Sequence, residues 1–268
     1  MSEFARGSLR TFWSSAVLAK RALFAWLNPV MWLMQLFGMS LFQIAFFVYV
    51  AMFVNNAEVT IEYVAIGNAL QSMAYVSVFA VCNITGEEKN QGTIEGLLVS
   101  PANRFSVFVG RAMVQIVNGL ATVTIAFLYA ALVFNVDFSQ ANYLGLVVVV
   151  LVTTFAMTGF GLMLSSLGLF LRTSMIVANI FLFVGLLVCG VNFPVAYLPA
   201  YFRPLSYAIP MTYGTEAARM AVGGAALGEL SGPLGAEALV GIAAMLVGYL
   251  MFRWFERLAR SRGTLDRF

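Results

Sequence analysis

Apolar residues are concentrated in six stretches of this sequence, and polar residues lie mainly in the segments between them. A helix needs about 20 mostly apolar residues to cross a bilayer. The stretches are residues 29–54, 63–84, 105–134, 143–171, 174–191 and 236–255. Because backbone groups in lipid must be paired within their own segment, each stretch is predicted to be an α-helix. We therefore expect an all-α polytopic membrane protein with six transmembrane helices in one domain, residues 1–268.

Two further segments do not fit a simple span. Residues 8–27 repeat apolar side chains at helical spacing, which predicts an N-terminal interfacial helix on the membrane surface. Residues 192–215 hold four of the seven prolines and several aromatic residues, so this segment cannot be one continuous span. Aromatic residues are common at the headgroup level, and an interfacial cap is the simplest interpretation of this segment.

Composition and charge position agree with a membrane protein. Of the 268 residues, 61% are hydrophobic and 10% are charged, whereas about a quarter are charged in soluble domains. Thirteen of the 15 Lys and Arg residues fall before the first span, around the second connection, near the end of the fourth span, or in the C-terminal tail. Basic residues accumulate on the cytoplasmic side, so both termini are predicted to be cytoplasmic. The net charge of +3 is then a topology signal and gives no reason to expect nucleic acid.

The residues that are missing exclude most enzyme classes. There is no histidine, which removes the commonest general base and metal ligand, and we expect no catalytic residue and no metal site. Lys20 and Lys89 are followed by Arg21 and Asn90, so no phosphate-binding loop with the GK[ST] ending is present. This chain is therefore not expected to hydrolyse ATP by itself.

Ion-coupled transport also lacks an obvious carrier. Such transporters keep ionisable side chains at membrane depth, whereas the acidic residues here fall in loops or at span ends, with Glu62 and Glu237 nearest to lipid. Uphill transport would then require work from a partner. Cys82 and Cys189 lie in apolar stretches and are expected to be small buried side chains, with a disulfide as the alternative.

The connection over residues 86–101 is the densest charge cluster between spans. Ile94, Leu97 and Leu98 follow helical spacing, which places them on one face of a short, otherwise polar helix. A helix of this kind can dock into a groove on another protein, although an ordinary turn between spans also fits. Ser100 and Pro101 form a good start for the next helix.

Two motifs carry a family resemblance. The string EKNQGTIEGLLVSP, residues 88–101, resembles the cytoplasmic motif of type-2 ABC transporter permeases of the daunorubicin-resistance exporter class. In that class, a charged stretch leads into G-T-x-E-x-L-L-x-[ST]-P. The string NFP at residues 192–194, followed by LP, PLSY, IPMTY and EAAR up to Arg219, is similar to a second pattern of the same family. Asn90 and Met211 depart from the usual residues, and the resemblance covers nearly the whole sequence.

The resemblance implies that residues 92–100 form a coupling helix against a separate ABC ATPase (nucleotide-binding) subunit. The residues it assigns to coupling are Glu88, Gly92, Thr93, Ile94, Glu95, Leu97, Leu98, Ser100 and Pro101. No cofactor is then expected on this chain, since ATP and Mg would be bound by the partner. The resemblance also implies a multi-pass protein of the bacterial cytoplasmic (inner) membrane that works as a homodimer.

The implied function is ATP-driven export of a lipophilic drug, antibiotic or lipid-like substrate. Export of a polysaccharide or lipid-linked glycan is an alternative within the class, and a passive channel or scaffold is an alternative from another class. The family pattern further implies that residues 192–215 form an extracytoplasmic re-entrant helical hairpin. Its possible outer gate comprises Phe193, Pro194, Pro199, Pro210 and Tyr213.

Polar and aromatic residues also share one side of the second span. Asn68, Ser72, Tyr75, Phe79 and Asn83 recur at helical spacing. They are expected either to bond neighbouring helices or to line a translocation path between two copies of the chain. Glu216 and Arg219 are spaced for a solvated ion pair.

Overall fold

The computed structural model describes residues 29–90, 104–170 and 174–262, together with Ser14. The long helices in these ranges are α2 (Pro29–Val54), α3 (Ile61–Asn90), α5 (Arg104–Leu132), α6 (Tyr143–Phe170), α7 (Ser174–Val188) and α10 (Leu227–Arg262). Three short elements lie between α7 and α10, namely η1 (Val195–Tyr197), α8 (Arg203–Tyr207) and α9 (Pro210–Val222). The described ranges contain no strand, and the predicted all-α fold is confirmed for them. The predicted interfacial helix, residues 8–27, lies outside the described residues apart from Ser14.

Local sequence signals explain several helix ends. Pro29 begins α2, where a missing N–H costs nothing because the first turn leaves that group unpaired. The Thr60 hydroxyl accepts a hydrogen bond from the Tyr63 N–H at 3.1 Å, and the Asn142 side chain accepts one from the Gly145 N–H at 2.9 Å. These side chains cap the starts of α3 and α6.

Four predicted helix boundaries are wrong by three or more residues, among them the end of α3 at Asn90 instead of residue 84 and the end of α10 at Arg262 instead of residue 255. Helix α7 ends at Val188 instead of residue 191, and Gly190 follows with a φ of +69° that favours glycine. Helix α10 begins at Leu227 instead of residue 236 and continues through Pro233. The prediction followed hydropathy, whereas helical hydrogen bonding also continues through the polar residues that precede the apolar stretch.

Three of the described helices are long and apolar enough to cross a membrane: Val30–Val54, Tyr143–Leu167 and Leu227–Trp254. Ile116–Leu132 and Ile176–Val188 are shorter apolar helices. Large apolar side chains project from the surfaces of α2, α7 and α10, including Phe42, Phe53, Phe183, Leu246 and Leu250. Such extended apolar surfaces are suited to lipid. The number of six spans stays a prediction.

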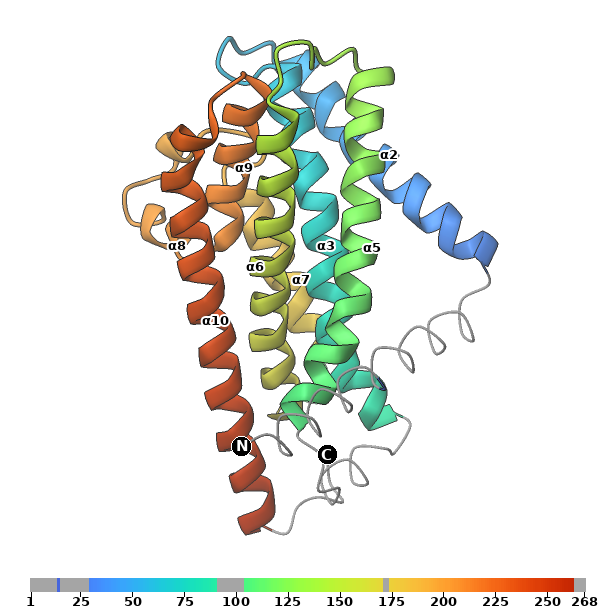
Figure 1. Cartoon of the computed structure of the whole chain (residues 1–268), viewed down its shortest axis with the longest axis vertical. Helices are drawn as coiled ribbons and strands as arrows, with labels where there is room; N and C mark the ends of the chain where they lie inside the picture. The colour runs from blue at the N-terminus through green and yellow to red at the C-terminus, as the bar shows by residue number, and fades with distance from the viewer. Residues whose placement is uncertain (1–13, 15–28, 91–103, 171–173, 263–268) are drawn as a thin grey trace.

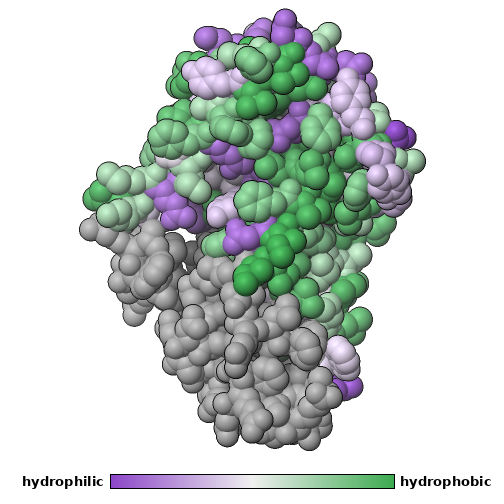
Figure 2. Space-filling view, turned by 180° about the vertical axis from the view of Figure 1, so that it is seen from behind, coloured by the Kyte–Doolittle hydropathy of each residue, from purple (hydrophilic) through white to green (hydrophobic). Residues whose placement is uncertain are grey.

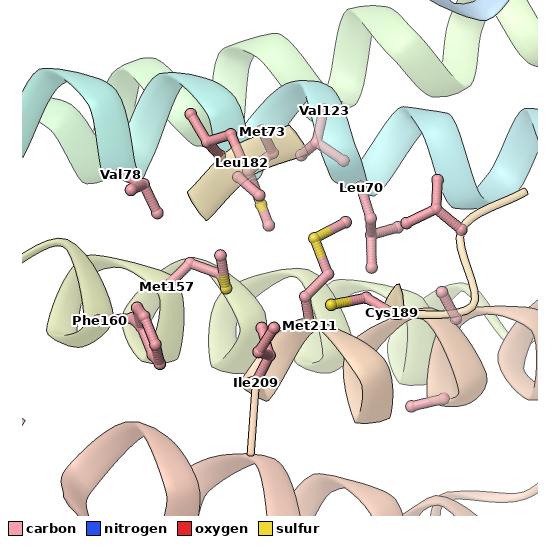
Figure 3. Packing of buried hydrophobic residues seen from close by; sticks show 14 of the residues in the cluster. Leu70, Met73, Val78, Val123, Met157, Phe160, Leu182, Cys189, Ile209 and Met211 are labelled. Carbon is pink, nitrogen blue, oxygen red and sulfur yellow. The ribbon is translucent and has the colours of Figure 1, made fainter. Parts of the chain in front are cut away.

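Helix α3 is the centre of the bundle. It packs against α2, α5, α6, α7 and α9, while α10 packs along α6 at the edge (Figure 1). Side chains from α3, α6 and α9 point toward one another in the core, among them Leu70, Met157, Phe160 and Met211 (Figure 3). Because α3 touches so many neighbours, a displacement of this helix would be felt across the bundle.

The connections gather at one end of the molecule. Residues 55–60 and 133–142 lie at the top of Figure 1, and residues 189–226, here named the α7–α10 connection, lie in the same half. Hydrophilic residues are frequent at this top end, whereas hydrophobic residues cover much of the side below it (Figure 2). The end of α3 and the start of α5 lie at the opposite end (Figure 1).

Candidate functional site

The predicted coupling residues fall largely outside the described residues. Glu88 belongs to the last turn of α3, whereas Gly92, Thr93, Ile94, Glu95, Leu97, Leu98, Ser100 and Pro101 lie in the range 91–103. Helices α3 and α5 flank that range. The described residues that bear on function therefore come from α3 and from the α7–α10 connection.

The polar residues of α3 divide into two groups by burial. Asn68 and Ser72 are buried inside the single chain. Asn68 donates to the Val64 carbonyl and to Asn192 Oδ1, and Ser72 donates to the carbonyl of Asn68. Asn68 therefore links α3 to the α7–α10 connection, whereas Ser72 bonds within α3 itself. Both roles that the sequence left open for this row stay predictions.

Tyr75 and Phe79 are half-buried and lie further along α3. Their rings stack with centroids 5.3 Å apart and an interplanar angle of 10°. The side chain of Asn83 lies outside the described set. The four described positions thus run along α3 from a buried polar pair to a partly exposed aromatic pair.

Buried polar atoms that the sequence reading missed lie beside this row. Gln71 donates to the Leu182 carbonyl of α7 at 3.3 Å. Within the described part of the chain, Gln71 Oε1, Asn68 Oδ1 and Ser77 Oγ are buried without a hydrogen-bond partner. Asn68 was already in the predicted row, and the signal for the other two was available as two further polar residues, Gln71 and Ser77, in an apolar span, where polar side chains usually bond another helix.

Prolines divide the α7–α10 connection into short helices. Pro194 precedes η1, Pro204 lies in the first turn of α8, and Pro210 begins α9. A proline fits these places because a first helical turn does not need its N–H. The prediction that this segment is no continuous span is confirmed.

The backbone carbonyls after α7 are paired by side chains from other elements. Ser206 of α8 donates to the Val188 carbonyl at 2.6 Å, and Thr215 of α9 donates to the Cys189 carbonyl at 3.1 Å. Tyr63 of α3 donates its phenol O–H to the Gly190 carbonyl at 2.9 Å. Helix C-terminal carbonyls have no partner within their own helix, so these contacts fix the end of α7.

Arg219 of α9 contacts both α3 and the turn that follows α7. Its Nη2 donates to the carbonyls of Tyr63, Gly190 and Val191 at 3.1, 2.8 and 3.0 Å. The guanidinium carbon also lies 3.4 Å from the centroid of the Tyr63 ring. The predicted solvated ion pair with Glu216 is therefore wrong, because the arginine side chain points inward to carbonyl oxygens.

The predicted outer-gate residues differ in exposure. Pro210 is buried, Phe193, Pro194 and Tyr213 are half-buried, and Pro199 is exposed. Tyr213 donates its O–H to the Tyr207 carbonyl at 3.1 Å. Their role as an outer gate stays a prediction.

A buried carboxyl group contradicts the expectation that acids stay out of the bundle. Glu237 lies in the apolar part of α10 and is 0% exposed. Both of its carboxyl oxygens lack a hydrogen-bond partner among the described residues, and the Thr153 hydroxyl of α6 is the neighbouring polar group. A Cβ on Gly214 of α9 would lie 2.5 Å from Glu237 Oε1 and 2.6 Å from Thr153 Oγ1. Hydropathy placed Glu237 at a span end, whereas packing of three helices buries it.

The cysteines behave as expected. Cys82 and Cys189 are buried, and neither forms a disulfide. In the described ranges, no group of three or more His, Cys, Asp or Glu residues is placed to hold a metal ion.

The pattern of the ABC-2 type transporter family matches residues 15–222, which is most of the chain. The chain belongs to the ABC-2 type transporter family. It is a multi-pass membrane permease domain, and domains of this family have no ATPase activity of their own and pair with ATPase subunits. The resemblance seen in the sequence is confirmed.

Two curated relatives are distant. The protein named "Probable multidrug ABC transporter permease YbhR" from Escherichia coli (strain K12) is 23% identical over 162 residues, covering 60% of this chain and 44% of the relative. Its counterpart from Escherichia coli O157:H7 gives the same values. The chain thus spans less than half of the length of these curated relatives.

Proposed function

We propose that this ABC-2 permease is the membrane-spanning subunit of an ATP-driven exporter of lipophilic drugs, antibiotics or lipid-like molecules. The observation that carries the proposal is the position of α3. This helix is buried at the centre of the bundle, and it runs between the segment with the coupling motif and the α7–α10 connection. A helix in this position can carry a movement made by a partner at one end to the other end.

The proposed cargo class follows from surface chemistry and from the distant relatives. Tyr75 and Phe79 offer a stacked aromatic pair on the partly exposed side of α3. Flat, apolar molecules bind well to such rings. The relatives are named as multidrug permeases. In a pair of identical chains, these rings would face the translocation path, with Asn68 and Ser72 on the same side of α3 nearer the α7–α10 connection and Asn83 nearer the opposite end.

The proposed mechanism uses the energy of a partner. ATP and Mg bind two ATPase subunits, and the closing of these subunits displaces residues 92–100, where Glu95, Leu97 and Leu98 make the contact. Movement of α3 and α5 then switches the path from inward to outward access, with Phe193, Pro194, Pro199, Pro210 and Tyr213 in the part that opens. Only contacts that differ between the open and closed partner can drive such a switch.

The proposed topology has six spans, both termini in the cytoplasm, and the α7–α10 connection on the outer side of a bacterial inner membrane. Basic residues support this orientation, since Arg104 and Arg111 lie at the α3–α5 end. Labelling of single cysteines in residues 55–60 with a membrane-impermeant maleimide tests it. We expect labelling from the outside of intact cells, and labelling only after lysis would contradict the orientation.

The decisive experiment is co-purification followed by transport. The permease is expressed with its ATPase subunit, and Leu98→Ala together with Glu95→Ala is compared with Leu246→Ala on the exposed face of α10. We expect the coupling variants to lose the ATPase subunit and ATP-dependent efflux of a lipophilic dye from proteoliposomes, while Leu246→Ala keeps both. Retention of both by the coupling variants would refute coupling through this segment.

A further inference from the structure

Arg219 connects α9 to the outer-facing end of α3 through the turn that follows α7. Its guanidinium donates to the Tyr63 carbonyl on α3 and to the carbonyls of Gly190 and Val191 in the turn. Carbonyl groups accept hydrogen bonds from a charged donor more strongly than from a neutral one. A single side chain therefore holds three backbone segments that are far apart in the sequence.

Tyr63 of α3 contacts both Arg219 and the turn after α7. Its ring lies under the guanidinium at 3.4 Å, and its phenol donates to the Gly190 carbonyl that Arg219 also contacts. A cation over an aromatic face is attracted by the negative charge of that face, most strongly where water is excluded. The Gly190 carbonyl thus accepts from both residues, so a shift of either one disturbs the other.

The neighbouring residues on α3 are shaped for this contact. A Cβ on Gly67 would collide with the Val191 carbonyl oxygen and would lie 2.7 Å from Arg219 Nη2. Position 67 of α3 therefore has to lack a side chain, because the loop after α7 could not otherwise approach the helix. Asn68, the next residue, donates to Asn192 Oδ1 at 2.8 Å and extends the contact along the connection.

We propose that Arg219 is the positioning residue that makes α3 and the α7–α10 connection move together, so that movement at the inner end of α3 opens the outer side. The inference rests on the proposed exporter function. It adds a specific linkage, in which a charged side chain bonded to backbone carbonyls of α3 and of the turn after α7 transmits the conformational change from one to the other. The contribution of Arg219 is a coupling free energy between the inner end of α3 and the α7–α10 connection at its outer end.

Arg203 provides a matched control within the same connection. It donates from Nε to the Leu198 carbonyl at 3.1 Å and from Nη2 to the Ala196 carbonyl at 2.7 Å. Both acceptors belong to the connection itself. Loss of Arg203 should therefore loosen the connection locally without releasing it from α3.

The test follows movement of the connection by labelling a single cysteine. Tyr201 is 75% exposed, and both native cysteines are buried, so Tyr201→Cys gives a reporter with little background. The complex of the permease with its ATPase subunit is labelled with a polar maleimide in proteoliposomes, with and without ATP and vanadate. Four proteins carrying this reporter are compared: the otherwise unchanged chain, Arg219→Gln, Arg219→Lys and Arg203→Gln.

We expect the labelling rate of the otherwise unchanged chain to change on ATP and vanadate. In Arg219→Gln, we expect that nucleotide-dependent change to shrink about tenfold, the size typical of a lost allosteric coupling, while the ATPase subunit stays bound. Arg219→Lys should recover part of the change, because lysine keeps the charge but not the planar fork. Arg203→Gln should keep the full change.

Gly67→Ala is the second variant and keeps Arg219 in place. Its methyl group should separate the turn from α3 and reduce the nucleotide-dependent labelling in the same way. Full nucleotide-dependent labelling in both Arg219→Gln and Gly67→Ala would overturn the linkage. Failure of the exporter proposal has a different result, since the reporter chain with Arg219 and Gly67 intact would then ignore ATP altogether.

Discussion

Two ionisable side chains point into the half of the bundle that holds the α7–α10 connection, the half-buried Arg219 and the fully buried Glu237, and their surroundings differ completely. Arg219 reaches three backbone carbonyls and an aromatic ring. Glu237 lies between α6, α9 and α10, and neither carboxyl oxygen has a partner among the described residues. The arginine can stay charged because its donors are paired, whereas a carboxylate without partners is too costly at this depth. We therefore expect Glu237 to be a neutral carboxylic acid and Arg219 to be a cation.

The position of a charged residue inside the bundle therefore does not by itself reveal its role. At Arg219, the charge holds chain segments together. At Glu237, the shape of the side chain matters more, because the absence of a side chain at Gly214 leaves room for its carboxyl group. The two positions should then respond in opposite ways to a neutral replacement.

The largest effect is expected for a fixed charge at position 237. Glu237→Lys would place an ammonium group with no partner among packed helices, which should cost more than about 3 kcal/mol of stability. Glu237→Gln keeps size and neutrality and should stay within about 1 kcal/mol of the original chain. Thermal unfolding in detergent, followed by size-exclusion chromatography, measures both. A Gln variant as unstable as the Lys variant would mean that the carboxyl group is ionised and paired.

A neutral replacement of Arg219 should be costly. Arg219→Met leaves the carbonyls of Tyr63, Gly190 and Val191 without their shared donor, and we expect a loss of about 2–4 kcal/mol. Arg203→Met, whose side chain is exposed, should lose clearly less. The same unfolding assay applies. Equal losses at the two arginines would show that the buried contacts of Arg219 add no stability beyond a surface contact.

The next largest loss of stability is expected where α10 packs closely against α6, near Glu237. A Cβ on Gly241 would lie 2.6 Å from Ala156 Cβ and 2.7 Å from its Cα, so Gly241→Ala should push α10 from α6 and cost about 1–3 kcal/mol. Gly235 lies in the same helix with nothing within 4 Å of its Cβ position. Gly235→Ala should be neutral or stabilising by up to about 1 kcal/mol, because alanine favours helix. A destabilised Gly235→Ala would contradict the steric explanation.

The smallest change in stability is expected at the exposed contact between Tyr197 and Glu58, here named the rim contact. Tyr197 donates its phenol O–H to Glu58 Oε2 at 2.6 Å, and this hydrogen bond raises the pKa of Tyr197 above its ordinary value of 10.0. The contact is therefore present below pH 10.0 and is lost as the pH rises through the raised pKa. Tyr197→Phe should shift the unfolding midpoint by no more than about 1 °C at pH 7, since exposed contacts contribute little. A larger shift would assign this rim contact a role comparable to that of Arg219.

The sequence predicted the helices well because apolar length is a property of each segment alone. The start and end of α2 and the starts of α6 and α7 agree with the predicted ranges. Hydropathy fails where polar residues continue a helix, as in the first turns of α10 before residue 236. The same limit placed Glu237 at a membrane surface, since its burial depends on Thr153 and Gly214 from other helices.

Sequence alone thus determined the membrane character, the helical class, the family motifs and the absence of a phosphate-binding loop. These features follow from local composition and from short ordered strings of residues. Only the tertiary structure decided which polar groups meet. Arg219 and Glu216 are three residues apart, and helical spacing alone predicted a pair, yet the arginine turns to carbonyls 28 and 156 residues away along the chain. In a bundle, the free energy of a buried polar group is set by its neighbours in space, and the order of residues along one helix does not contain those neighbours.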